Sequence, residues 1–177
     1  AAVHLLKTAA GKCSAVLLPV DSEHNAVFQC LETENKSSLS KITLTASGGP
    51  FLSWSYEEMR KATPEQAVAH PNWSMGQKIS VDSATLMNKA LEVIEAVIFF
   101  DLSPEQIDVV VHPQSLIHAF VSYSDGSVLT HMGPADMKVP ILHALSYPQR
   151  LGTCTEELDI QKLSSLTFQA VDADKFP

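Results

Sequence analysis

The sequence predicts an α+β fold, in which a mixed sheet with an antiparallel hairpin is flanked by helices. Residues 116–123 and 127–131 alternate enough between apolar and polar side chains to form two strands. Asp125-Gly126 lies between them and is typical of a tight hairpin turn. Residues 79–100 contain neither Gly nor Pro and predict a long helix. Helices combined with an antiparallel hairpin indicate an α+β fold and not a doubly wound sheet.

The other elements follow from local patterns along the chain. Thr63-Pro64-Glu65-Gln66 and Ser103-Pro104-Glu105-Gln106 mark helix starts, because each combines a capping hydroxyl, a first-turn proline and a capping-box glutamine. In order, the sequence predicts the end of a helix at 1–12, an apolar buried strand at 15–20, a short helix at 23–31, a polar loop at 32–40, strands at 41–45 and 107–111, a helix at 137–146, and an irregular segment with one or two extended pieces at 151–177.

Two carboxylates one residue apart, Asp21 and Glu23, follow the predicted strand at 15–20. Such oxygens suit a hard divalent cation, and open α/β sheets place their ligands at the carboxyl ends of strands. Acids and serine just after a strand are also typical of a turn or a helix cap. The sequence alone leaves both interpretations open.

The predicted helix at 79–100, with Asp82 or Ser83 as its N-cap, carries two different stripes. One stripe is apolar and predicts the buried face. The other has two acids and no base, unlike a solvated face with paired charges, and a sheltered pair of acids needs a cation, a proton or hydrogen-bond donors. The apolar stripe is Met87, Leu91, Ile94 and Ile98, and the polar stripe is Thr85, Asn88, Glu92 and Glu95.

Two further groups of residues have the chemistry of an anion site. Ser47-Gly48-Gly49-Pro50 follows a predicted strand, and its glycines let backbone amides approach an anion, although an ordinary Gly-Gly turn is the alternative. Ser83, Asn88 and Lys89 offer a hydroxyl, an amide and a cation near one helix start, where the helix dipole favours phosphate.

The segment from His70 to Gly76, HPNWSMG, mixes large apolar side chains with polar ones. This composition suits a lid that closes over a ligand and excludes water. A loop anchored in the core by Trp73 is the alternative.

Five blocks of sequence resemble the 1-deoxy-D-xylulose 5-phosphate reductoisomerase family, and the similarity runs through almost the whole chain. The blocks are LLPVDSEHNA at 17–26, LTASGGPF at 44–51, HPNWSMG at 70–76, KISVDSAT at 78–85 followed by MNK at 87–89, and VHPQS at 111–115. The resemblance implies conversion of 1-deoxy-D-xylulose 5-phosphate to 2-C-methyl-D-erythritol 4-phosphate in non-mevalonate isoprenoid biosynthesis, with NADPH as reductant. A metal-dependent phosphosugar enzyme of another reaction, and a binding or dimerisation module, are the rival hypotheses.

The resemblance also implies a role for individual residues. Asp21, Glu23 and Glu92 would hold one divalent cation, Mg²⁺, Mn²⁺ or Co²⁺. Trp73 and Met75 would form the lid, and Gly76 would touch NADPH. The implied substrate-binding residues are Ser22, Glu23, Ser47, His70, Ser83, Asn88, Lys89 and Glu92, with the phosphate held mainly by Ser47, Ser83, Asn88 and Lys89. No residue is assigned as a general base.

The family pattern divides the chain into three expected parts. Residues 1–20 would be the tail of an N-terminal Rossmann-type NADPH-binding domain, 21–150 the central catalytic domain, and 151–177 a linker towards a C-terminal helical domain. The sequence contains no GxGxxG fingerprint, so we expect the isolated fragment to be inactive. The resemblance implies a homodimer in a bacterial cytoplasm or a plastid. A net charge of −8 argues against a nucleic-acid partner, and no apolar run reaches the roughly 18 residues of a membrane span.

Overall fold

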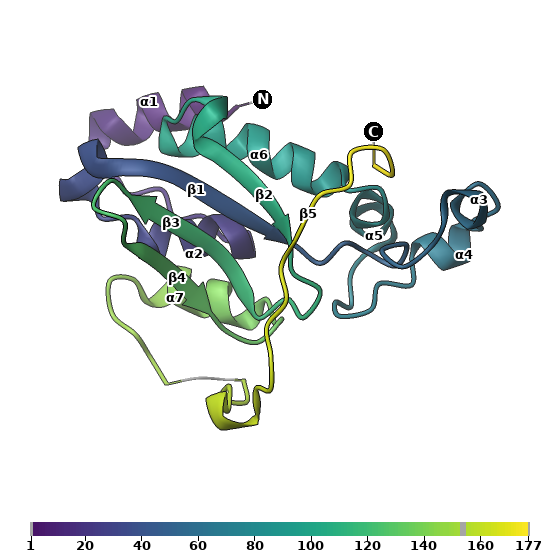
Figure 1. The fold of residues 1–177 in the computed structure, drawn as a ribbon. Helices are drawn as coiled ribbons and strands as arrows, with labels where there is room; N and C mark the ends of the chain where they lie inside the picture. The colour runs from purple at the N-terminus through teal and green to yellow at the C-terminus, as the bar shows by residue number, and fades with distance from the viewer. Residues whose placement is uncertain (1, 153–154, 177) are drawn as a thin grey trace.

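A computed structural model describes residues 2–152 and 155–176 of the chain (Figure 1). Its five-stranded sheet has the order β4-β3-β1-β2-β5. The central strand β1 runs parallel to β2 and antiparallel to β3, and the other pairs are antiparallel, so the predicted mixed sheet is confirmed. The strands are β1 (Leu39–Ala46), β2 (Ile107–Val111), β3 (Ile117–Tyr123), β4 (Val128–Met132) and β5 (Gln169–Ala170).

The helices agree with the predicted positions at most points of the chain. Thr63 and Ser103 both form the expected capping boxes, and Gly126 makes the hairpin turn with a positive φ of 89°. The α-helices are α1 (Val3–Cys13), α2 (Ser22–Cys30), α3 (Tyr56–Met59), α4 (Pro64–Ala67), α5 (Gln77–Ala84), α6 (Met87–Phe100) and α7 (Lys138–Ser146), and the 3-10 helices span Thr33–Ser38, Pro104–Gln106 and Ile160–Lys162. Within the described residues, no helix is long and apolar enough to cross a membrane.

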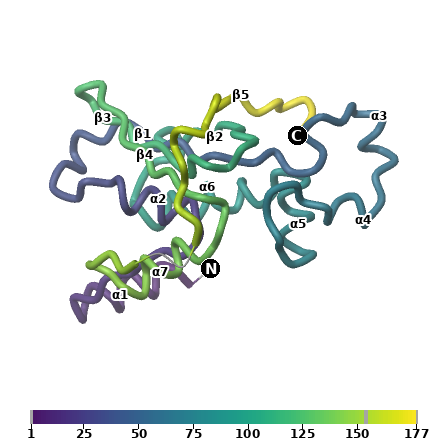
Figure 2. The backbone as a smooth tube through the Cα atoms, turned by 90° about the horizontal axis from the view of Figure 1, so that it is seen from below, coloured from purple at the N-terminus to yellow at the C-terminus, as the bar shows by residue number. Residues whose placement is uncertain are grey.

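One face of the sheet forms the core with α2 and α6 (Figure 2). Ile42 and Leu44 of β1 are completely buried there, because alternate residues of a strand point to the same face. Ala26 and Val27 bring α2 onto this face, and Ala96 brings α6. The two helices therefore lie side by side over the sheet. The first turn of each lies near the end of the sheet where β1 ends.

The predicted strand at 15–20 is wrong. These residues have no strand pairing, and Val16 and Val20 are largely exposed. Pro19 has no backbone N–H to offer to a neighbouring strand. The apolar run instead leads into α2 as an extended connection, and Asn25 fixes it by donating from its side chain to the carbonyl of Pro19, 2.8 Å away.

The single helix predicted for 79–100 is also wrong, as is its N-cap at Asp82 or Ser83. Asp82 and Ser83 lie inside α5, and α6 starts only after Leu86, whose φ of 58° is left-handed. The hydroxyl of Thr85 bonds back to the carbonyls of Val81 and Asp82, and such local bonds compete with helix continuation. Asn88 and Lys89 therefore lie in the first turn of α6.

The face of α6 that packs on the core is not the predicted apolar one. Met87, Leu91 and Ile94 are substantially exposed, whereas Glu92 is only 3% exposed and lies on the face that carries Ala96 and Phe100. The two acids of the predicted polar stripe therefore lie in different environments. Glu92 points inward, and Glu95 remains exposed.

Candidate active site

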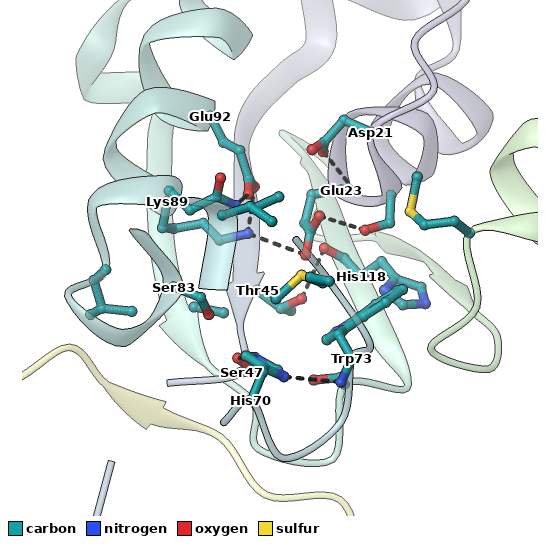
Figure 3. Close-up of a pocket in the computed structure, with 18 of the residues that line it drawn as sticks. Asp21, Glu23, Thr45, Ser47, His70, Trp73, Ser83, Lys89, Glu92 and His118 are labelled. Atoms are coloured by element: carbon teal, nitrogen blue, oxygen red, sulfur yellow. Dashed lines mark hydrogen bonds and ion pairs between the residues drawn. The ribbon is translucent and has the colours of Figure 1, made fainter. Parts of the chain in front are cut away.

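A cavity of about 210 Å³ opens where β1 ends and where α2 and α6 begin (Figure 3). Of the sequence-predicted site residues, only Gly76 is absent from its wall. The cavity is lined by Asp21, Ser22, Glu23, Ser47, His70, Trp73, Met75, Ser83, Asn88, Lys89 and Glu92, together with Thr45, Leu86, Ser115, His118 and several others. The structure thus gathers the predicted residues, from segments far apart in the sequence, around one space.

Three carboxylates meet on one side of the cavity. Asp21, Glu23 and Glu92 each place an oxygen within 4.8 Å of the other two. Asp21 is also the N-cap of α2, because its Oδ1 accepts from the backbone N–H groups of Glu23 and His24 at 3.1 and 3.3 Å. The sequence left two roles open for Asp21, a helix cap and a cation ligand. The structure allows this residue to have both.

Burial and mutual repulsion shift the pKa values of these acids. Burial raises the pKa of Asp21, and it raises that of Glu92 well above the ordinary value, with the charge of Glu23 adding to both. Burial also acts to raise the pKa of Glu23, but the Lys89 ammonium and the Ser22 hydroxyl lower it overall. Closely spaced anions of this kind favour a bound cation, and carboxylate oxygens are the ligands that Mg²⁺ and Mn²⁺ prefer.

Lys89 lies on the same side of the cavity and bridges two of the acids. Its Nζ is 3.2 Å from Oε1 of Glu23 and forms a close ion pair with Glu92. Asn88 donates from its amide to the other carboxylate oxygen of Glu92. Although burial alone would lower the pKa of Lys89, Glu23 and Glu92 raise it, so the side chain is a cation. Two of the four predicted phosphate-binding residues, Asn88 and Lys89, therefore contact a predicted metal ligand.

His24 supports the acids from behind. Its Nε2 lies 2.9 Å from the backbone carbonyl of Glu92, and a carbonyl only accepts, so this nitrogen carries hydrogen. Its Nδ1 faces Asp21 at 3.6 Å and Glu95 at 3.9 Å. His24 thereby ties the start of α2 to α6 and fixes the distance between the ligands that each helix supplies.

Ser47 and His70 form a second polar group across the cavity. Nδ1 of His70 accepts the backbone N–H bonds of Asn72 and Trp73 at 3.1 and 3.0 Å, so Nε2 must carry the hydrogen and donate to Oγ of Ser47 at 2.8 Å. Burial lowers the pKa of His70, which keeps the imidazole neutral at neutral pH. Oγ of Ser47 also accepts from the N–H of Gly49, which leaves its own hydrogen free for a ligand.

The Gly-Gly turn brings the Ser47 loop close to α5. Gly48 and Gly49 both have positive φ, at 84° and 66°. A Cβ on Gly49 would lie 2.6 Å from the carbonyl oxygen of Ser83. Glycine is needed there for both reasons, and the close approach places the two predicted phosphate-binding serines on the same wall.

The loop 70–76 forms the remaining wall. Trp73 and Met75 line the cavity, and the Trp73 ring lies 6.3 Å from the ring of His118. Asn72 ties the loop to the end of the sheet by donating to the carbonyl of Pro113 at 2.6 Å and to Oγ of Ser115 at 3.1 Å. Trp73 is only partly buried, so it is not anchored in the core. Movement of the loop as a lid stays a prediction.

Sequence reasoning missed several residues of the cavity, two of which are polar residues of the sheet. His118 of β3 is 4% exposed, and burial lowers its pKa, so it presents a neutral imidazole beside the acids. Thr45 of β1 is buried and bonds to the carbonyls of Ile117 and His118. Thr45 stands in the block 44–51 but was assigned no role there, and His118 stands in no motif; the pairing of β1 with β3 brings both to the site.

The fold and the cavity define an α+β domain with a partly buried three-carboxylate site of the kind that holds a divalent cation. Two family models match the sequence, "1-deoxy-D-xylulose 5-phosphate reductoisomerase C-terminal domain" over residues 17–100 and "DXP reductoisomerase C-terminal domain" over residues 132–177. The chain belongs to the 1-deoxy-D-xylulose 5-phosphate reductoisomerase family.

Relatives of known name agree with this assignment. The reductoisomerases of Bradyrhizobium sp. and Desulfosudis oleivorans are 52% and 58% identical to the chain, over 95% and 91% of its length. These matches cover 41% and 42% of the relatives, so the chain spans about two fifths of the length of the curated relatives it matches.

Solved structures give the same result. A DOX-P reductoisomerase in complex with NADPH, fosmidomycin and magnesium has a TM-score of 0.93 at 50% identity, covering 99% of this chain and 45% of that one. The Zymomonas mobilis enzyme in complex with NADPH has a TM-score of 0.90 at 48% identity, with the same coverage of both chains.

Proposed function

We propose that this chain supplies the metal- and substrate-binding part of a reductoisomerase that converts 1-deoxy-D-xylulose 5-phosphate to 2-C-methyl-D-erythritol 4-phosphate with NADPH and a divalent cation. The observation that carries the proposal is the convergence of Asp21, Glu23 and Glu92 in a cavity that also contains Ser47 and Ser83. One region offers hard oxygen ligands, and a neighbouring one offers hydrogen-bond donors for a phosphate.

The three carboxylates fit one Mg²⁺, Mn²⁺ or Co²⁺ ion. They are close enough to share it. Burial, with the charge of Glu23 adding to it, raises the pKa values of Asp21 and Glu92, and a bound cation would favour their ionised forms. Such an ion, when bound, acts as a Lewis acid that polarises the ketone and the adjacent hydroxyl of the sugar. His24 holds the ligands from α2 and α6 at a fixed distance from each other, so that they can share the ion.

The phosphate of the substrate belongs beside Ser47 and Ser83, in the same cavity. Ser47 has a free hydroxyl hydrogen because His70 and Gly49 already donate to its oxygen. Ser83, Asn88 and Lys89 line the same cavity beside the start of α6, where the helix dipole favours an anion. Trp73 and Met75 would cover the carbon chain and exclude water from a reactive carbonyl intermediate.

The nucleotide-binding part of the enzyme, with its glycine-rich turn, is proposed to come from a segment outside the 177 residues, with Gly76 as a contact to NADPH. Gly76 is exposed at the N-cap of α5, with open space around it, and a large cofactor can approach it there. We also propose that the complete enzyme is a homodimer, as the family resemblance implies.

The test is Glu92→Gln in the full-length protein. Glutamine keeps the helix, because the two residues have similar helix propensity, but it removes one anionic ligand. We expect Mn²⁺ affinity to fall about ten- to a hundredfold, which corresponds to a charge-assisted bond of roughly 1.5–3 kcal/mol, and turnover to be lost.

Glu95→Gln is the matched control, since it makes the same substitution three residues along α6 on an exposed side chain. It should bind Mn²⁺ and turn over like the wild type. Parental Mn²⁺ binding and turnover by Glu92→Gln would contradict the three-carboxylate site.

A further inference from the structure

The contacts of Lys89 conflict with a simple role as a phosphate ligand. Its side chain is buried, and its ammonium reaches Glu23 at 3.2 Å and pairs closely with Glu92 (Figure 3). Its hydrogen bond is donated to a carboxylate oxygen of Glu92. The ammonium therefore binds the same two carboxylates that, with Asp21, form the metal-type cluster.

A divalent cation held by these carboxylates would compete with the Lys89 ammonium for them. Mg²⁺ binds oxygen at about 2.0–2.1 Å, so an ion shared by Glu23 and Glu92 would lie next to Nζ of Lys89. Like charges at this separation repel strongly in a buried site, because there is little water to screen them. Entry of the ion must weaken or break the ion pairs of Lys89.

The cavity offers the displaced ammonium another partner. Lys89 lies in the first turn of α6, on a long flexible stem, and Ser47, Ser83 and Asn88 line the same cavity. A phosphate among these donors would restore an ion pair to the ammonium without the cost of leaving it buried and unpaired.

We propose that Lys89 and the divalent cation compete for Glu23 and Glu92, so that binding of the ion releases the ammonium to the phosphate of the substrate. The inference rests on the proposed function and adds to it a coupling between the binding of the ion and the binding of the phosphate. The ion and a phosphate group bind cooperatively, and the site takes up a phosphorylated ligand effectively only when the cation is present. Lys89 is the residue that couples the two.

The experiment measures this coupling by calorimetric titration of the full-length protein. Mg²⁺ is titrated with and without a saturating simple phosphate monoester, glycerol phosphate, and the monoester is titrated with and without Mg²⁺. We expect each to tighten the other by the same factor, about tenfold, since coupling between two sites is reciprocal. Lys89→Met should bind Mg²⁺ more tightly than the wild type, bind the monoester more weakly, and lose the coupling.

Lys78→Met is the matched control, because it removes a lysine charge from the neighbouring helix α5, where Lys78 is exposed and pairs with Asp82. It should keep the wild-type affinities and coupling. Lys89→Gln retains a polar end towards Glu92 and gives the same readout where the methionine variant does not fold.

Two results would overturn this inference and leave the proposed function standing. In one, the wild type binds Mg²⁺ and the monoester independently. In the other, the Lys89 variants keep the full wild-type coupling, so that the ion contacts the phosphate without help from Lys89. A wild type that binds neither ligand would instead contradict the proposed function, and the inference with it.

Discussion

Among single residues, Glu92 shows how strongly the fold changes an ordinary side chain. On a solvated helix it would be a surface acid, but here it is buried, and burial and the charge of Glu23 raise its pKa well above the ordinary 4.5. A folded-state pKa above the unfolded one means that the protonated form stabilises the fold at low pH. This contribution is lost as the pH rises through the raised pKa.

The raised pKa predicts how cation binding responds to acid. Because an ion needs deprotonated ligands, protons compete with it, and Mg²⁺ affinity should already fall with decreasing pH above the range in which ordinary carboxylates titrate. Calorimetric titration at several pH values measures this, with Glu95→Gln as a control that keeps the wild-type profile. An affinity that stays constant down to pH 4.5 would show that Glu92 is not a ligand.

The site residues were predicted from the sequence to different degrees. Asp21 and Glu23 form a local motif, whereas Glu92 joins them through the family pattern and not through its spacing. His118 could not be found in this way, because only the pairing of β3 with β1 brings it to the cavity. A residue in the middle of an ordinary strand carries no local signal of function.

At the level of elements, helical periodicity identified two faces of α6 but not which one is buried. The acid-bearing face also carries Val93, Ala96 and Phe100, and these pack on the sheet, so Glu92 is buried with them. The break between α5 and α6 contains neither Gly nor Pro, so the sequence carries no signal for it. The strand predicted at 15–20 failed because hydrophobicity does not show whether a pairing partner exists.

The turn at Gly49 depends on a backbone conformation that only glycine adopts without strain. Gly49→Ala should destabilise the fold by about 1–3 kcal/mol, because alanine is strained at positive φ and its Cβ would meet the carbonyl of Ser83. Urea unfolding measures the change.

Gly11→Ala in α1 is the control for Gly49→Ala. No atom lies within 4 Å of its added Cβ, so alanine should be neutral or stabilising by about 0.5–1 kcal/mol. Equal stability of the Gly49→Ala variant and the wild type would show that the turn relaxes freely and does not position Ser47.

For the whole molecule, the α+β class, the mixed sheet and the hairpin were predicted correctly, because β1, β2 and the hairpin strands all have clear patterns. The order of the strands was not predicted. The two-residue strand β5 pairs with β2 only after the chain has passed the hairpin and α7, and a long-range pairing of this kind leaves no mark on a two-residue sequence.

The activity of the isolated chain is also a property of the whole molecule. The 177-residue chain alone should oxidise no NADPH, since its sequence lacks the glycine-rich turn that holds a dinucleotide pyrophosphate. Nicotinamide absorbance with substrate and Mg²⁺ present should stay constant, whereas we expect the full-length protein to consume NADPH under the same conditions. Sustained metal-dependent oxidation by the 177-residue chain would refute the fragment interpretation.

The two walls of the cavity differ in how firmly the backbone is held. The end of β1 has a hydrogen-bonded neighbour on each side, and Ala46 also accepts from the backbone N–H of His112 at 2.7 Å. The loop 70–76 is held to the neighbouring segments by side-chain hydrogen bonds of His70 and Asn72. We therefore expect ordering of the loop to contribute more to the conformational entropy lost on ligand binding than ordering of the sheet. Substitutions in the loop can adjust affinity through this entropy alone, while the wall formed by the sheet stays preorganised.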